Sequence, residues 1–205
     1  MTNSDLKKTV NTNFKNIGDN FKLKESIFYK IPALDFLIGF CFEKSKNEND
    51  SLYVWSFIQP LYVPNDSISL SFGRRLNDKL WKLKGINSSK EELAELHALM
   101  VNENDNFFEQ VDSVKKFYDH FENSGKNLRM IEALVYSAIY SQNVDAEMII
   151  DNFISTLRKE NLSIAWIGKI LEQMEYLKSI IADKELLENL FNKNIEYTKR
   201  NLHID

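Results

Sequence analysis

The stretch from Phe36 to Leu76, FLIGFCFEKSKNENDSLYVWSFIQPLYVPNDSISLSFGRRL, decides the fold because it holds the densest aromatic and β-branched sequence and the clearest strand signals. Three segments in it alternate between apolar and other side chains with a period of two residues, which is the pattern of a β-strand. A polar insert rich in turn formers separates the first two and predicts a hairpin. The predicted strands cover 36–43, 52–58 and 67–72, and the insert covers 45–50.

Two prolines follow the second of these strands. Pro60 and Pro64 bracket Leu61, Tyr62 and Val63. Because proline has no N–H to give to a ladder, we predict a sheet edge, a bend or a strand end here, with Tyr62 exposed. A weaker alternation over 21–31, imperfect at Glu25 and Phe28, predicts one further strand. The signals together predict a meander of three or four antiparallel strands.

The rest of the chain shows helical periodicity. Ser4 or Asp5 is predicted to cap a first helix that ends near Gly18 and lies across one face of the sheet. Ser88 and Ser89 open two overlapping Ser-x-x-Glu capping boxes, which predict a helix start. Apolar positions at helical spacing predict further helices over 76–83, 105–121, 128–140, 146–157, 164–181 and 186–202.

Short links between the later helices favour antiparallel neighbours and hence a bundle. A solenoid of the tetratricopeptide or HEAT kind is the alternative, but the small and aromatic positions of the tetratricopeptide pattern do not recur. The sequence therefore predicts an α+β fold, in which a small antiparallel sheet of three or four strands in the N-terminal third is followed by a predominantly helical bundle. No linker interrupts the chain, so we expect a single domain over 1–205, with subregions 1–84 and 85–205.

Composition narrows the class of protein. The net charge of -4 gives no reason to expect a nucleic acid or an anionic membrane as partner. No apolar run approaches the roughly 20 residues that span a bilayer, and the first 20 residues lack the apolar centre of a secretory signal. Cys41 is the single cysteine, which fits a reducing compartment. The abundance of Asn, Lys and Ile is typical of an AT-rich bacterial genome, so we expect a bacterial, cytoplasmic protein.

Arg74 and Arg75 are the first candidates for a site. They follow a predicted strand end and a glycine, and two adjacent guanidinium groups can engage a phosphate or a carboxylate with forked hydrogen bonds. The alternative is that they pair with nearby acids such as Asp78 and close the corner.

The aromatic residues of the sheet region are the second candidates. Tyr53, Trp55, Phe57 and Tyr62, with Trp81 near them in sequence, are placed to line a groove for a base, a peptide or another protein, or to fill the core of the sheet. Tyr62 and Trp55 are the members that we expect to contact a partner, because an exposed edge is a natural docking site for another chain.

Catalytic patterns are weak. A set of four residues resembles in outline the Asp...Glu-x-Lys pattern of restriction-type nucleases, but Ser45 stands where that pattern needs lysine. The set is Asp35, Glu43, Lys44 and Lys46. Eight residues along one strand would also hold the two acids ~26 Å apart, too far to share a metal. Nothing in the sequence brings Cys41 to a histidine. We therefore predict no catalytic residues, no metal site and no cofactor.

The function that these observations favour is non-enzymatic. We expect an intracellular protein–protein interaction protein, such as an immunity, adaptor or accessory subunit of a bacterial multi-component system. The alternative is a ligand-binding or phosphoester- or nucleotide-processing enzyme that uses Arg74 and Arg75. A homo-oligomer is the third possibility, favoured if the helical part leaves a large apolar face exposed.

Overall fold

The computed structural model describes residues 2–14, 17, 20–46, 48, 51–82, 89–124 and 127–204. The chain divides into two compact units. The first, which we call the sheet unit, comprises Met1–Gln59, Ile68–Gln110 and the terminal Asp205; the second, the helical unit, comprises Pro60–Ser67 and Val111–Ile204. That all 205 residues form one domain stays a prediction.

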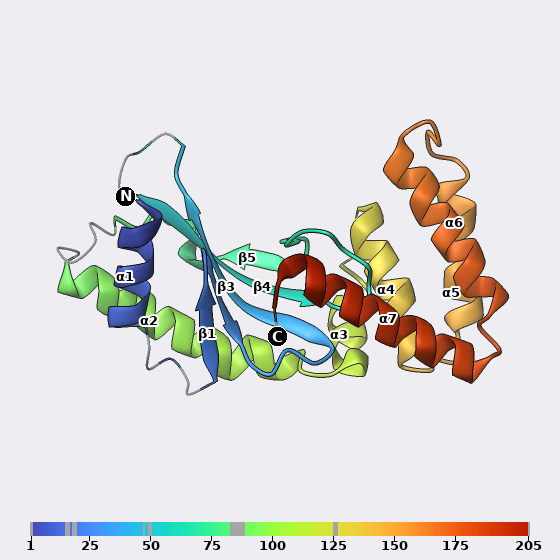
Figure 1. Cartoon of the computed structure of the whole chain (residues 1–205), viewed down its shortest axis with the longest axis horizontal. Helices are drawn as coiled ribbons and strands as arrows, with labels where there is room; N and C mark the ends of the chain where they lie inside the picture. Colours follow the sequence, from blue (N-terminus) through green and yellow to red (C-terminus); the bar gives the residue numbers. More distant parts are fainter. Residues whose placement is uncertain are drawn as a thin grey trace. The chain divides into compact units, whose positions relative to one another are not determined.

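The sheet unit contains an antiparallel sheet of five strands whose spatial order follows the chain (Figure 1). The α+β fold is thus confirmed, with five strands instead of three or four. The extra strand arises within 21–31, where Glu25 takes a φ of 53° and the expected single strand turns back on itself. The strands are β1 Phe21–Lys24, β2 Ile27–Lys30, β3 Phe36–Lys44, β4 Leu52–Pro60 and β5 Gly73–Arg75.

The strand predicted over 67–72 is wrong. The backbone N–H of Ser69 donates to the side chain of Gln59 at 2.9 Å, and the hydroxyls of Ser69 and Ser71 lie 3.0 Å apart. The backbone N–H of Ser71 donates to the Ser69 hydroxyl at 3.3 Å. Because side chains accept from the N–H groups of Ser69 and Ser71, these groups do not pair with a neighbouring strand. The regular ladder with β4 begins at β5, which holds both arginines, although the Phe72 carbonyl already accepts from the Ile58 N–H of β4 at 3.4 Å.

One face of the sheet is covered by helices. α1 (Asn3–Asn13) is capped by Thr2 rather than by Ser4 or Asp5, because the backbone N–H of Asp5 donates to the Thr2 hydroxyl and the Asp5 carboxylate accepts from the Thr2 N–H. After the helix, Phe14 stacks on Phe42 of β3 at 6.2 Å. The predicted helix end at Gly18 lies outside the described residues, as do Asn47, Asn49 and Asp50 of the polar insert.

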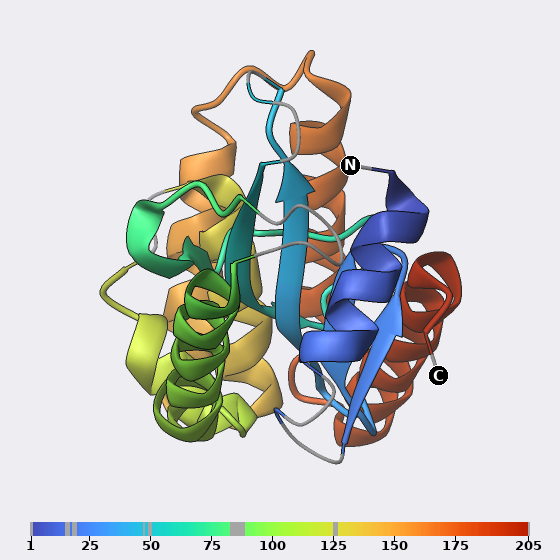
Figure 2. The same cartoon turned by 90° about the vertical axis from the view of Figure 1, so that its left-hand side faces the viewer.

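α2 (Lys90–Glu103) lies over the same face, in front of the strands in Figure 2. Ser89 caps it as predicted, by accepting from the N–H of Glu92 at 3.0 Å, whereas Ser88 lies outside the described residues. The chain then continues through a π-helical turn, in which Phe108 packs 5.3 Å from Phe40.

Two predicted helices need correction. The helix expected over 105–121 is two elements, because Ser113 caps a separate helix, α3 (Val114–Phe121). The helix expected over 76–83 is only a 3-10 turn, Leu76–Asp78, because Asn77 and Asp78 have positive φ angles of 58° and 43°. Residues 83–88 lie outside the described part.

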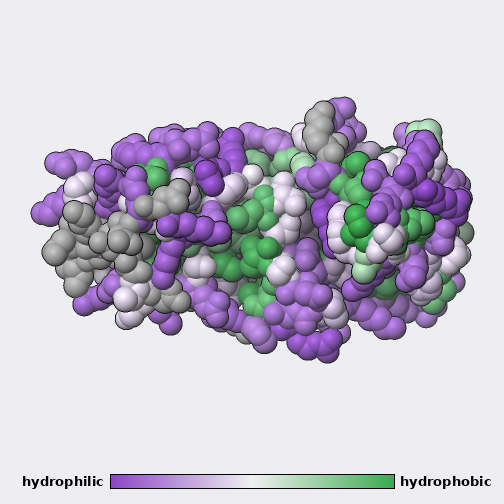
Figure 3. Space-filling model, turned by 90° about the horizontal axis from the view of Figure 1, so that it is seen from above, coloured by the Kyte–Doolittle hydropathy of each residue, from purple (hydrophilic) through white to green (hydrophobic). Residues whose placement is uncertain are grey.

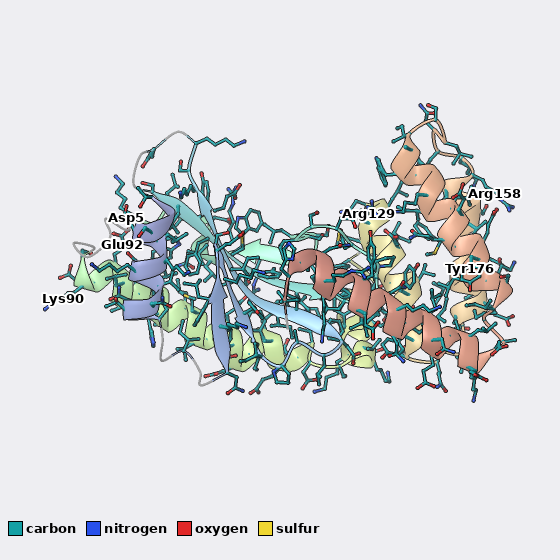
Figure 4. The ribbon with its side chains drawn as sticks, in the orientation of Figure 1. Asp5, Lys90, Glu92, Arg129, Arg158 and Tyr176 are labelled. Atoms are coloured by element: carbon teal, nitrogen blue, oxygen red, sulfur yellow. The ribbon has the colours of Figure 1, made fainter. Side chains whose placement is uncertain are left out.

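The helical unit is built around α4 (Leu128–Tyr140), which is buried almost all round as its sequence predicts. α3 and α5 pack against α4, and α5 packs against α6. Arg129, labelled in Figure 4, joins α4 to α6, because its guanidinium lies 5.1 Å from the ring centroid of Trp166. The other helices match their predicted ranges closely: α5 Ala146–Leu157, α6 Ala165–Ser179 and α7 Lys184–Leu202.

The proline-bracketed segment belongs to this helical unit and not to the edge of the sheet. Tyr62 is fully buried, contrary to its predicted exposure, and its hydroxyl lies 2.7 Å from that of Ser137 on α4. From α7, Asn194 donates to the Tyr62 carbonyl at 3.0 Å and Thr198 donates to the Val63 carbonyl at 3.2 Å. These bonds satisfy the polar groups that a strand would otherwise pair.

Most of the large hydrophobic side chains that are exposed belong to the helical unit, and Figure 3 shows hydrophobic residues at its surface among hydrophilic ones. Within the described ranges, no helix is long and apolar enough to cross a bilayer. The exposed set in this unit is Val144, Met148, Leu162, Ile164, Trp166, Tyr176 and Leu186.

Candidate partner-binding site on the sheet

Arg74 and Arg75 occupy successive positions of β5, and their side chains therefore lie on opposite faces of the sheet. In the register of β4 and β5, Arg74 pairs with Ser56 and Arg75 pairs with Trp55. One anion does not meet both guanidinium groups in this arrangement. The two arginines have to be considered separately.

Arg74 lies on the face that α2 covers. Its Nε and Nη2 atoms each donate to one carboxylate oxygen of Glu103, both at 2.7 Å. The Ser56 hydroxyl donates to the same carboxylate, and the guanidinium lies 5.0 Å from the ring centroid of Phe107. The bond to Glu103 raises the pKa of Arg74. Arg74 thus makes the forked ion pair that the sequence offers as its alternative role, although the acid is Glu103 and not Asp78.

Arg75 lies on the other face, stacked on aromatic rings. Its guanidinium carbon is 3.8 Å from the ring centroid of Tyr53 and 4.8 Å from that of Trp55. The Trp55 indole N–H donates to the carboxylate of Glu43 at 2.9 Å. We call these four side chains, which come from β3, β4 and β5, the aromatic–arginine cluster.

The cluster is partly accessible. Glu43 is exposed, and the other three members are half-buried. The Nε atom of Arg75 is buried and has no hydrogen-bond partner among the described residues. Tryptophan, tyrosine and arginine are the side chains that most often dominate the binding energy of protein interfaces. Since the stacking already orders the Arg75 guanidinium, Arg75 would lose little side-chain conformational freedom when a partner binds.

The remaining aromatic candidates do not join this cluster. Phe57 and Trp81 are fully buried, and Tyr62 is in the helical unit. The predicted aromatic groove is therefore reduced to Tyr53 and Trp55. Sequence reasoning missed Glu43 as their neighbour, although its parity places it on the face of β3 opposite Phe42.

Sequence reasoning also missed Glu103, because it lies in a polar run, Asn102–Asn106, that looks solvated in the sequence. Helical spacing could have indicated that Glu103 is buried, because it places Glu103 on the same side of α2 as the buried Leu96 and Met100.

The structure also provides observations on two weaker catalytic hypotheses, the nuclease-like set and Cys41 as a nucleophile. Glu43 of the nuclease-like set bonds to Trp55, and across the described ranges no three His, Cys, Asp or Glu side chains gather as metal ligands would. Burial, aided by the charge of Glu43, raises the pKa of the Cys41 thiol to about 11. A thiol with that pKa is a poor nucleophile at neutral pH.

Comparison with known proteins identifies no relative of this chain. No family model matches the sequence, and no curated protein or solved structure matches it significantly.

Proposed function

We propose that this chain is a non-enzymatic, cytoplasmic protein that works by binding another protein, as an immunity, adaptor or accessory subunit of a bacterial multi-component system. The observation that carries the proposal is the aromatic–arginine cluster, in which Tyr53 and Trp55 hold the Arg75 guanidinium. A half-buried Trp, Tyr and Arg on one sheet face is the composition of an interface hot spot. The cluster contains one cation, Arg75, and one anion, Glu43, so it suits a partner surface of mixed polarity.

The competing function is a ligand-binding or phosphoester- or nucleotide-processing enzyme that uses Arg74 and Arg75 together. The geometry gives that proposal less support, because the two side chains lie on opposite faces and Arg74 is held by Glu103. A homo-oligomer that uses the cluster is a form of the same binding function, with a second copy as the partner.

Site-specific photocrosslinking tests the proposal. A benzophenone amino acid replaces Tyr53 in the full chain, expressed in the organism from which the sequence comes. Asp119, exposed on α3 of the helical unit, is replaced in the matched control. We expect one protein to crosslink in stoichiometric yield from position 53 and not from position 119. Trp55→Ala combined with Arg75→Ala should abolish that adduct, whereas Arg74→Ala should leave it.

Native mass spectrometry of the purified protein gives the opposing outcomes. A chain that forms no adduct from position 53 and carries a bound small molecule would overturn the proposal in favour of the ligand-binding class. An adduct between two copies of the chain would identify the partner as the protein itself. An adduct that depends on Arg74 and Arg75 equally would contradict the assignment of the cluster.

A further inference from the structure

A second possible site is a pocket in the helical unit, remote in sequence from the aromatic–arginine cluster. Its volume is about 560 Å³, which is within the range of natural binding pockets. It is formed by the end of α4, the turn between α4 and α5, the start of α5, Ile181 and the first half of α7. Its lining includes Tyr140, Val144, Glu147, Lys184, Glu188 and Phe191.

The pocket has an aromatic wall and one strongly exposed apolar side chain, Val144. Tyr140 and Phe191 stack with their ring centroids 4.4 Å apart and their planes 20° from parallel. Val144 lines the pocket and is 96% exposed, so its side chain contributes almost nothing to the core. An apolar side chain that lines a pocket and is exposed to solvent is available to contact a bound molecule.

The charged residues that line the pocket indicate which kind of ligand it would bind. Glu147 and Glu188 both line the pocket, both are exposed, and neither belongs to an ion pair within the described part of the chain. Lys184 is the single cation of the lining, which is therefore acidic overall. Glu147 lies in the first turn of α5, where its negative charge also interacts favourably with the helix dipole. Glu188 lies beyond the first turn of α7, so its charge gains little from the dipole of that helix.

We propose that this pocket is a docking site for a basic amphipathic segment of a partner protein. An apolar side chain of the segment would enter beside Tyr140 and Phe191, and lysine or arginine side chains flanking it would pair with Glu147 and Glu188. Charge complementarity selects this occupant, because two exposed carboxylates against one ammonium group in the lining favour a cationic segment, and a second copy of the chain is an outcome that the test distinguishes. The proposal goes beyond the proposed function, since it concerns another unit and another partner chemistry.

Fluorescence anisotropy with a model peptide tests it on the full chain. The probe is a fluorescein-labelled 16-residue amphipathic helix of leucine and lysine, and the control is the same design with glutamate in place of lysine. We expect saturable binding of the lysine peptide alone. Glu147→Lys with Glu188→Lys should weaken it about ten-fold, since two attractions become repulsions. Val144→Ser, at a side chain outside the core, should weaken it about three-fold through lost apolar contact.

A charge-matched double variant separates this pocket from general attraction to an acidic protein. Glu160 and Glu172 are exposed in the same unit and do not line the pocket. Glu160→Lys with Glu172→Lys should change the affinity by less than about two-fold. Equal losses in the two double variants, or binding that Val144→Ser does not affect, would overturn the proposal. So would sedimentation of the wild-type protein as a dimer that Val144→Ser dissociates, because a second copy would then occupy the pocket.

Discussion

Arg74 and Arg75 are adjacent in the chain, yet the first binds Glu103 beneath α2 and the second stacks on Tyr53 and Trp55 on the opposite face of the sheet. One arginine neutralises a buried carboxylate, and the other presents an ordered cation at a partly accessible surface. The pair therefore offers an internal comparison, because substitutions one residue apart should have separable effects on stability and on binding.

Arg74→Ala should destabilise the protein more than Arg75→Ala. The Glu103 side chain is only 5% exposed, so loss of Arg74 leaves a buried charge with the Ser56 hydroxyl. We expect a cost of about 2 kcal/mol in the free energy of unfolding, below the usual range for a buried pair because Arg74 itself is 62% exposed. Arg75→Ala, which loses cation–π contacts, should cost about 1 kcal/mol.

Urea unfolding followed by tryptophan fluorescence measures both variants. Adding Glu103→Gln to Arg74→Ala serves as the control, because it removes the buried charge and should recover part of the loss. Equal costs for the two arginines, or a further loss in the double variant, would contradict the role assigned to Arg74.

Glu132 should make the stability of the helical unit depend on pH. It is fully buried on α4, one oxygen accepts from Arg129 at 2.9 Å, and the other has no hydrogen-bond partner among the described residues. Burial raises the pKa of Glu132, against the opposing effects of Arg129 and Lys169. A raised pKa in the folded state means that the stability from this group is present below the unfolded pKa and is lost as pH rises through the folded pKa.

The pH dependence of the free energy of unfolding is compared between the wild type and Glu132→Gln, whose side chain does not titrate. As pH rises from about 4.3, the ordinary value for glutamate, the wild type should lose stability relative to this variant, by at most about 1.4 kcal/mol per pH unit. Unfolding free energies measured at intervals from pH 4 to pH 8 give the difference. A difference that stays constant, or that moves the other way, would show that Arg129 outweighs burial.

Cys41 should react slowly with alkylating reagents. With its pKa raised to about 11, only about one thiol in a thousand is ionised at pH 8. We expect carboxamidomethylation by iodoacetamide, followed by mass spectrometry, to be about a hundred-fold slower than for free cysteine. Glu43→Gln removes the charge that helps to raise the pKa and should accelerate the reaction. Labelling as fast as that of free cysteine would be incompatible with the raised pKa of this half-buried thiol.

Two glycines should respond in opposite directions to alanine. A Cβ on Gly39 would lie 2.3 Å from the Phe28 carbonyl oxygen and 2.7 Å from the Tyr29 Cα, both backbone atoms of β2. Gly39→Ala should therefore force the two strands apart and cost about 3 kcal/mol or more. On α6, a Cβ on Gly168 would meet nothing closer than 3.6 Å, so Gly168→Ala should gain about 0.5–1 kcal/mol. Thermal unfolding measures the stability of both variants. A loss of stability in Gly168→Ala would contradict the open space described on α6, and an unchanged stability in Gly39→Ala would contradict the close packing of β2 and β3.

The sequence predicts β3, β4 and the helices α5–α7 because their apolar side chains recur with one clear period, and it predicts α4 because its apolar run is typical of a helix buried almost all round. It fails where polar side chains replace backbone pairing, as Gln59 and Ser69 do for the N–H groups of Ser69 and Ser71, and where a turn lies inside an alternating segment, as at Glu25. Part of the candidate site could be predicted from the sequence. Trp55 and Arg75 were both candidates, but their contact depends on the register of β4 and β5, which no local pattern sets.

The Pro60–Ser67 segment belongs to the helical unit, while the strands before and after it belong to the sheet unit. No single cut of the polypeptide therefore releases either unit intact. A C-terminal fragment that starts at Val111 would lack Tyr62, whose ring meets Tyr140 and Phe191 edge-on, and would expose the aromatic surface that this ring covers. Deletion mapping, in which shorter and shorter pieces are assayed for binding, would thus report failed folding of the fragments. For this chain, interaction sites are better located by point substitutions in the intact polypeptide.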